Sequence, residues 1–343
     1  MRKLIFALFL FTIIYSQTAV NPDISVIGDL VGTTDSNIYD FSSSGVELAI
    51  QGYVNPFARA NVYLHKHNDE SPIHLEEAFL SIERGLPMNL GLRAGKMRPD
   101  FGKINQEHMH TYFYILSSEP AQSLLGDEMW GTLGLEGNLL LPLPWYSNIS
   151  LGIFQEGITQ HNHDEEMEEH DHEEAEHEHE EEHEDEDVGK AFSGRLSHFF
   201  DLNSVTHLEF GTSYYIELEN TESNILGADF KFKWRPDTYR SIILQGDYFH
   251  KNGHDGELIN AGYIWANYQF NRIWNAGIIL DYSNDIEEET YKSFGLFAGF
   301  SPVEESSVFR LRVHQTYQGD NNPNLTFVAQ VLWSLGPHKP HQF

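Results

Sequence analysis

Apolar and polar residues alternate along almost the whole chain, with a period of two. In the stretch Asn324–Leu335, one set of alternate positions is apolar: Leu325, Phe327, Ala329, Val331, Trp333 and Leu335. The positions between them are largely polar: Asn324, Thr326, Gln330 and Ser334. A period of two belongs to the β-strand, whose successive side chains point to opposite faces, whereas a helix repeats every 3.6 residues. The pattern therefore predicts an all-β chain.

Marking every alternating run predicts about sixteen strands. They lie near residues 24–34, 46–54, 56–65, 73–83, 88–98, 130–141, 146–157, 190–201, 204–218, 222–235, 239–250, 257–270, 274–284, 290–301, 307–317 and 324–335. Most of them reach the ~9–11 residues that a tilted strand needs to cross a bilayer.

The connections between these strands alternate between short and long. Tight turns such as Asn55-Pro56 and Leu202-Asn203 alternate with long polar loops, of which 99–129 and 158–189 are the longest. This alternation is typical of outer-membrane barrels, and tryptophans gather near the predicted strand ends, where indole rings prefer the membrane boundary. We therefore expect a transmembrane antiparallel up-and-down β-barrel of about 16 strands, with short periplasmic turns and long extracellular loops. A soluble β-sandwich is the alternative, but it would not explain the alternating loops.

The first 19 residues have the pattern of a secretory signal. Arg2 and Lys3 precede an apolar run, Leu4–Ile14, and small or polar residues follow. This run is too short to span a membrane as a helix. We expect a signal peptide at 1–19, a barrel at 20–336, a periplasmic tail at 337–343, and a location in the outer membrane of a Gram-negative-type bacterium. Barrel-assembly machinery and outer-membrane lipid are then expected partners.

A run of 27 residues, 161–187, contains seven His and 17 acidic residues and no Lys or Arg. Imidazoles and carboxylates are ligands for borderline divalent ions such as Zn²⁺. The predicted metal ligands of the run are His161, His163, His170, His172, His177, His179 and His183. The alternative is a solvated acidic loop without a metal role. A segment this polar cannot bury enough apolar surface to fold alone, so we expect a disordered extracellular loop. We expect this loop to bind metal weakly at several sites and to lose the metal below about pH 6, where imidazoles become protonated.

A second group of residues surrounds the start of the other long loop. Three cations, Arg93, Lys96 and Arg98, end a predicted strand, and His108 and His110 follow. A loop of this length can fold inward and narrow a wide barrel, where both histidines could bind metal beside Glu107 or Glu119. In the competing interpretation the cations pair with lumenal carboxylates and the histidines bind the wall by hydrogen bonds.

The segment Leu75–His110, LEEAFLSIERGLPMNLGLRAGKMRPDFGKINQEHMH, resembles the family of zinc-regulated TonB-dependent outer-membrane receptors. The stretches Gly134–Glu136 and Leu141–Pro144 and the insertion rich in His and acids are similar to that family too. The resemblance implies expression under zinc limitation and a role in zinc passage across the outer membrane. TonB-dependent receptors carry a plug inside a barrel of about 22 strands. The first strand predicted here begins close to the end of the signal, so we expect a porin-like barrel without a plug.

These observations favour a porin-like channel for a divalent metal, with an external loop that concentrates the ion. Zn²⁺ or another divalent transition metal is expected as bound or transported ion, and no prosthetic group is expected. A general small-solute or anion porin is the first alternative, with Arg93, Lys96, Arg98, Arg310 and Arg312 lining its channel. A barrel that only anchors a metal-sequestering surface protein is the second.

The sequence predicts no enzyme, because no Ser, His and acid are placed together at one strand end. The acidic balance, with 52 acidic against 21 basic residues, argues against nucleic acid as a partner. A homotrimer is compatible with a sixteen-stranded barrel, although no interface can be assigned from the sequence.

Overall fold

The computed structural model describes residues 21–35, 38–42, 45–66, 72–158, 189–218, 223–253, 258–286, 289–303, 306–319 and 321–336. The predicted signal peptide at 1–19, the His-rich run at 161–187 and the predicted tail at 337–343 lie outside these residues.

The described residues form seventeen strands and four short helices. The strands are β1 (Asp23–Asp35), β2 (Ile38–Ser42), β3 (Val46–Asn55), β4 (Ala58–Lys66), β5 (His74–Ile82), β6 (Leu90–Met97), β7 (Thr132–Leu140), β8 (Tyr146–Phe154), β9 (Ala191–Asn203), β10 (Thr206–Glu217), β11 (Asn224–Trp234), β12 (Ser241–Asn252), β13 (Leu258–Gln269), β14 (Trp274–Ile286), β15 (Glu289–Val303), β16 (Ser307–Gln318) and β17 (Asn324–Leu335). The helices are η1 (Pro87–Asn89), η2 (Ile104–Gln106), η3 (Met109–Thr111) and α2 (Glu119–Leu125). None of the helices in the described part of the chain is long and apolar enough to cross a membrane.

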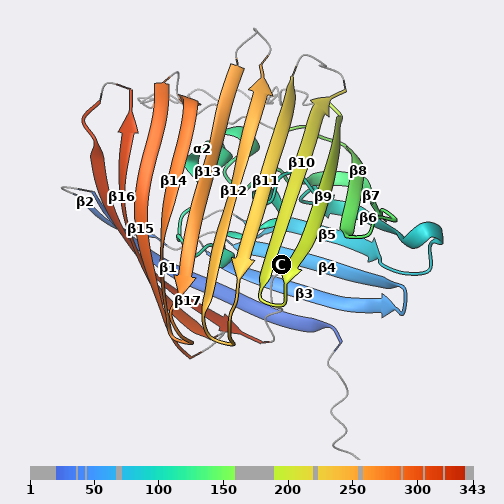
Figure 1. Cartoon of the computed structure of the whole chain (residues 1–343), viewed down its shortest axis with the longest axis horizontal. Helices are drawn as coiled ribbons and strands as arrows, with labels where there is room; N and C mark the ends of the chain where they lie inside the picture. The colour runs from blue at the N-terminus through green and yellow to red at the C-terminus, as the bar shows by residue number, and fades with distance from the viewer. Residues whose placement is uncertain are drawn as a thin grey trace, which may run out of the picture.

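The strands close into an antiparallel barrel (Figure 1). From β3 onward each strand pairs with its successor, and β17 pairs with β1. β1 pairs with β3 over Asp23–Gly28 and with β2 over Val31–Asp35, so β2 and β3 follow one another along the same edge. Seventeen strands with two in one position give sixteen positions around the barrel. The pairing of β17 with β1 closes the sheet on itself, which is how a β-structure avoids open sheet edges in a bilayer.

The predicted fold class is confirmed, and most strand bounds agree with the prediction to within three residues. No strand is predicted between the runs 24–34 and 46–54, and this is wrong in part, because β2 continues the wall there. The apolar residues between positions 35 and 45 are few and lie among Ser and Asn, so the alternation of apolar and polar residues there is weak.

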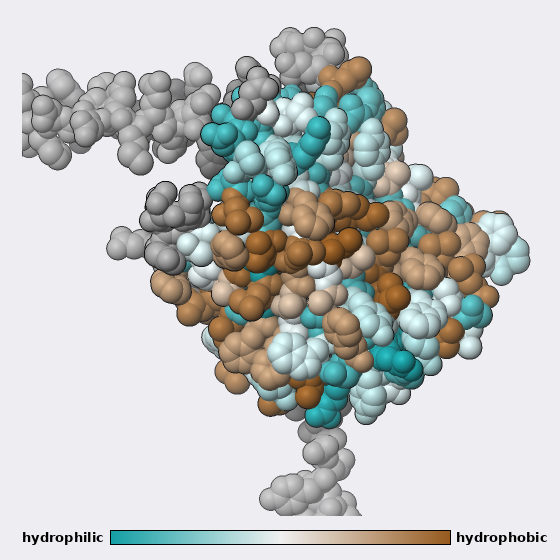
Figure 2. All heavy atoms as spheres, turned by 60° about the vertical axis from the view of Figure 1, so that its left-hand side comes forward, coloured by the Kyte–Doolittle hydropathy of each residue, from teal (hydrophilic) through white to brown (hydrophobic). Residues whose placement is uncertain are grey.

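The two faces of the wall differ in polarity as the alternation predicts. In β16, Phe309 and Leu311 are 44% and 63% exposed, whereas Arg310 and Arg312 are 8% and 4% exposed. The apolar residues point outward, and Figure 2 shows them gathered across the middle of one face, with hydrophilic residues above them. An apolar exterior and a polar interior are the pattern of a barrel that spans a membrane.

The barrel has a short-turn end and a long-loop end. The turn between β9 and β10 lies at the first, and the end of β8 and the start of β9 lie at the second (Figure 1). These two names are used below.

Candidate metal centre inside the barrel

Residues 98–131, which connect β6 to β7, lie inside the barrel and are called the luminal segment below. Apolar packing against the wall holds much of it. The Phe101 ring stacks on Phe249 of β12 with ring centroids 5.8 Å apart, and the Tyr114 ring lies 5.9 Å from Trp265 of β13. Phe101 and Tyr114 are fully buried. Burial of this size contributes about 1.5–3 kcal/mol per large side chain, so the segment is a packed part of the structure.

Hydrogen bonds fix the same segment to the wall. The backbone N–H of Lys103 donates to Asp247 Oδ1 at 2.6 Å, and Ser118 Oγ donates to Asp281 Oδ1 at 2.7 Å. Arg312 Nη1 donates to the carbonyl of Tyr114 at 3.2 Å. These partners come from β12, β14 and β16, so the segment is anchored across a wide arc of the barrel.

One group of charges between the segment and the wall is fully paired. Arg195 of β9 lies 3.0 Å from Asp100 and 2.6 Å from Asp229, and Lys103 lies 2.6 Å from Glu209. Each buried acid of this group thus has a cationic partner within hydrogen-bond distance. We call these five residues the paired network; its pattern is that of a structural anchor.

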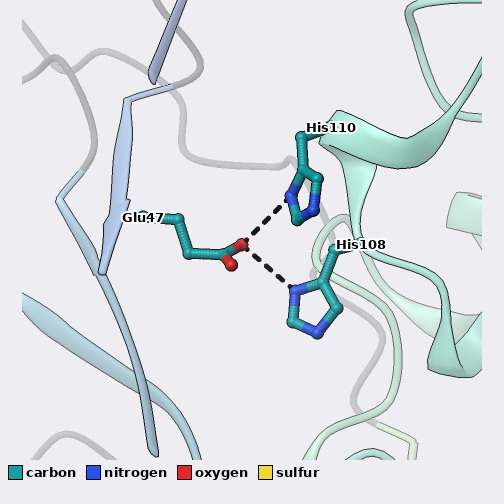
Figure 3. A group of neighbouring side chains, drawn as sticks. All are labelled: Glu47, His108 and His110. Atoms are coloured by element: carbon teal, nitrogen blue, oxygen red, sulfur yellow. Dashed lines mark ion pairs between the residues drawn. The ribbon is translucent and has the colours of Figure 1, made fainter. Parts of the chain in front are cut away.

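A different group lies where the segment meets β3. The Nδ1 atoms of His108 and His110 lie 3.2 and 3.3 Å from the same oxygen of Glu47, Oε2 (Figure 3). Their ligand atoms all lie within 4.8 Å of one another. The three side chains are only 10–13% exposed. Two imidazole nitrogens and one carboxylate oxygen form a common ligand set for Zn²⁺. These three residues are called the metal cluster below.

A β-bulge brings two further carboxylates to this place. In the pairing of β4 with β5, Tyr63 lies opposite Glu77 and Leu64 lies opposite Leu75, so Glu76 is the extra residue. A bulge can re-aim a side chain, and here both Glu76 and Glu77 reach His108. Glu77 Oε1 lies 3.1 Å from His108 Nε2, and Glu76 Oε2 lies 3.6 Å from His108 Nδ1.

The cluster is short of hydrogen bonds, unlike the paired network. His108 is 8% exposed, and its Nδ1 makes ion-pair contacts with Glu47 Oε2 and Glu76 Oε2, but neither His108 Nδ1 nor Glu76 Oε2 makes a well-directed hydrogen bond. The other oxygen of Glu76, Oε1, forms an ion pair with Arg98. Buried polar atoms usually make well-directed hydrogen bonds, so a ligand that both atoms can bind would complete their coordination.

The charge around His108 is mostly negative. Burial and the Arg98 guanidinium lower the pKa of His108, but Glu47 and Glu76 outweigh them and hold it well above its usual range. The site thus favours a positive charge at this ring, and a metal cation would satisfy the same field.

The metal cluster lies between two cavities. A large one of about 1270 Å³ is lined by all three cluster residues and reaches Asn89, Tyr146, Asp201 and Lys233 near the short-turn end. A small one of about 40 Å³ is also lined by the cluster, together with Gly45, His65, Glu76 and Met109. The small cavity therefore lies beside the start of β3 and the end of β4, which face the long-loop end. An ion that passes from one cavity to the other would meet the cluster.

The five cations predicted to line the channel have different positions and partners in the structure. Arg93, paired with Glu136 at 2.9 Å, and Arg98 line the large cavity. Arg310 and Arg312 point inward, but they donate to the carbonyls of His110, Tyr114 and Leu116 and thus hold the luminal segment.

Lys96 departs from the prediction. It lies opposite Leu133, which is 55% exposed on the outer face, and cross-strand partners share a face. Its Nζ donates to the carbonyl of Leu75 at 2.8 Å, and it does not line either of these two cavities.

The acids expected beside the two histidines are different in the structure. Glu107 turns away and accepts a hydrogen bond from Gln245 at 3.0 Å, and Glu119 begins α2. Glu47, Glu76 and Glu77 take their place, because the segment brings His108 and His110 against β3 and β5. The adjacent acids at 76–77 break the period of two, which is the one signal of the bulge in the sequence.

Comparison with known proteins identifies the architecture. No family model matches the chain. A protein of Aquifex aeolicus (strain VF5) described as uncharacterized is 23% identical over 335 residues, which cover 88% of this chain and 70% of that protein.

Several solved structures share the barrel. The anion-selective porin from Comamonas acidovorans has a TM-score of 0.60 at 8% identity, with 92% of this chain and 100% of that chain covered. The outer membrane channel DcaP of Acinetobacter baumannii has a TM-score of 0.57 at 8% identity, with coverage of 93% and 99%. A loop L8 deletion mutant of OmpT, an outer membrane protein of Vibrio cholerae, has a TM-score of 0.59 at 9% identity, with coverage of 92% and 99%. The chain therefore has the fold of outer-membrane porins and channels.

Proposed function

We propose that this protein is an outer-membrane channel for a divalent transition metal, with Zn²⁺ as the leading candidate. The observation that carries the proposal is the metal cluster: two histidines and one glutamate, nearly buried, between two cavities of a porin-like barrel. The ion is the cargo of the channel, and no catalytic role is proposed.

Two of the three spacings between ligand atoms in the cluster suit zinc, and the third, between the two histidine nitrogens, is within 4.8 Å. Two ligand atoms at 2.0–2.1 Å from a tetrahedral Zn²⁺ lie roughly 3.3–3.4 Å apart. The two nitrogen-to-oxygen distances in the cluster are 3.2 and 3.3 Å. Glu76 Oε2, 3.6 Å from His108 Nδ1, is the nearest candidate for a fourth ligand. A site with three protein ligands keeps one position open, and an exchangeable site is what passage requires.

The proposal extends to the parts of the chain outside the described residues. The His-rich run 161–187 would raise the local concentration of metal at the mouth, because its carboxylates and imidazoles attract cations. The leader at 1–19 would direct export, and the short-turn end would then face the periplasm. A homotrimer is part of the proposal, since one similar OmpT structure is a trimer form.

A general porin for small solutes or anions is the second candidate. The large cavity has room for more than a bare ion, and several cations line it. Arg93, Lys103 and Arg195 in that lining are each paired with an acid, so these three leave little positive charge for an anion, whereas the presence of Arg59, Lys231 and Lys233 in the same lining favours this candidate.

Zinc uptake into proteoliposomes tests the metal function. The full-length protein is reconstituted around a zinc-sensitive dye, and the wild type is compared with the double variant His108→Ala/His110→Ala. His207→Ala is the matched control, because His207 lies near the short-turn end and pairs with Asp201. We expect the double variant to lose most zinc uptake while the control keeps it. Equal zinc uptake in all three proteins would contradict the proposal.

A further inference from the structure

We propose that His65 and His74 form a second metal-binding pair, which receives the ion on the long-loop side and passes it to the metal cluster. This inference rests on the proposed function and adds an entry site to it. His65 and His74 are called the outer pair below.

The pairing of the strands places the outer pair in one row with the cluster. Glu47 of β3 lies opposite His65 of β4, and His65 lies opposite His74 of β5. Residues directly opposite one another share a face and have Cβ atoms about 4.5–5.5 Å apart. Glu47 faces the lumen, so both histidines lie on the lumenal face. Two imidazoles at this spacing can bind one ion together.

Exposure changes along this row. His74 is exposed, His65 is 9% exposed, and Glu47 is 9% exposed. The outer pair therefore has one ligand in contact with solvent and one ligand inside. An ion bound there would already be partly dehydrated before it reached the buried cluster.

The small cavity connects His65, the inner member of the pair, with the cluster. It is lined by His65, Glu76 and the three cluster residues, and its volume of about 40 Å³ exceeds the ~30 Å³ that a water molecule occupies in the liquid. Gly45 keeps this space open: a Cβ there would lie 2.8 Å from His65 Nε2 and 2.2 Å from the carbonyl oxygen of Lys66. The backbone φ of +120° at Gly45 also favours glycine.

Transfer along the row needs only ligand exchange. Imidazole nitrogens bind metal in their neutral form, so the ion can leave one imidazole as it gains the next nitrogen or carboxylate oxygen. No bond to carbon and no change of oxidation state is involved. The gain of two carboxylates at Glu47 and Glu76 would draw the cation inward.

Anomalous diffraction locates both sites directly. Crystals of the full-length protein are soaked in ZnCl₂ at a series of concentrations, and maps are calculated from data at the zinc edge. We expect one peak at the metal cluster and a second between His65 and His74. The variant His74→Gln should lose the second peak and keep the first, and because His74 is exposed the substitution should leave folding intact. His207→Ala should keep both peaks.

The outcomes distinguish this inference from the proposed function. A peak at the cluster without one at the outer pair, at every zinc concentration, would overturn the inference and leave the metal function standing. The absence of both peaks would overturn both. In proteoliposomes, His74→Gln should slow zinc entry by about tenfold when zinc is scarce, because the outer pair loses one of its two imidazole ligands, and tenfold weaker binding corresponds to about 1.4 kcal/mol. An unchanged rate would count against transfer through the pair.

Discussion

Two groups of buried charge in the barrel interior, the paired network and the metal cluster, differ in how their polar atoms are paired. In the paired network, Arg195 forms ion pairs with Asp100 and Asp229, and Lys103 forms one with Glu209, at distances of 2.6–3.0 Å. In the metal cluster, acids meet imidazoles, and His108 Nδ1 and the nearby Glu76 Oε2 lack a hydrogen-bond partner. Both groups join the luminal segment to the wall, so position alone does not explain the difference.

The difference shows how a structural anchor and a binding site can be told apart. A buried carboxylate is stable when a cation satisfies it, and the paired network achieves this with its own residues. In the metal cluster the Nδ1 atoms of two imidazoles converge on one carboxylate oxygen, an arrangement that a bound cation can satisfy. Separate variants of the two groups should therefore affect stability and metal binding separately.

The largest expected effect is on stability. Arg195→Met removes the cation from Asp100 and Asp229, and an uncompensated buried charge costs about 3–5 kcal/mol in free energy of unfolding. Urea unfolding of the protein in detergent micelles measures this loss, and a folded fraction should still bind zinc at the cluster. Loss of less than about 1 kcal/mol would show that the network is not the anchor we describe.

The second effect is stabilisation by zinc itself. A ligand that binds only the folded protein, present at about 100 times its Kd, stabilises it by about 2.7 kcal/mol. Thermal unfolding should show this gain for the wild type and for Glu209→Gln, which alters the paired network. The double variant His108→Ala/His110→Ala should lose the part of the gain that comes from the cluster. The same zinc response in the double variant would assign all binding to residues elsewhere.

The smallest effect concerns the bulge. Glu76→Gln keeps the size of the side chain but removes one negative charge near His108 Nδ1, and we expect about tenfold weaker zinc binding, equal to about 1.4 kcal/mol. Titration of zinc against a competing chelator measures it. Glu209→Gln again serves as the control, and an equal change in both variants would mean that only the net charge of the interior matters.

Much of the barrel could be predicted from the sequence, because each strand carries its own period of two. β17 begins and ends at the predicted residues, Asn324 and Leu335. The bilayer outside and the polar lumen inside impose this alternation on every strand, so no knowledge of the neighbours is needed. β2 was missed because five residues contain too few alternations to be distinguished from a loop.

The site could be predicted only in part. His108 and His110 stand two residues apart and were predicted as ligands, yet Glu47 is 61 positions from His108 in the sequence. Glu47 meets the two histidines only because of the place where the luminal segment packs. That place depends on contacts across the barrel, such as the one between Phe101 and Phe249. Local patterns carry no information on such pairings. The bulge at Glu76 had a signal in the two adjacent acids, but the sequence alone does not show toward which face they turn.

The most direct test of the account is the reversal potential of single channels in a planar bilayer under a ZnCl₂ gradient. The account predicts that Zn²⁺ carries current through the wild-type channel and that His108→Ala/His110→Ala shifts the reversal potential toward that of chloride. His207→Ala should behave as the wild type. A wild-type channel that prefers chloride, with the same reversal potential in all three proteins, would contradict a metal channel and support the general anion porin.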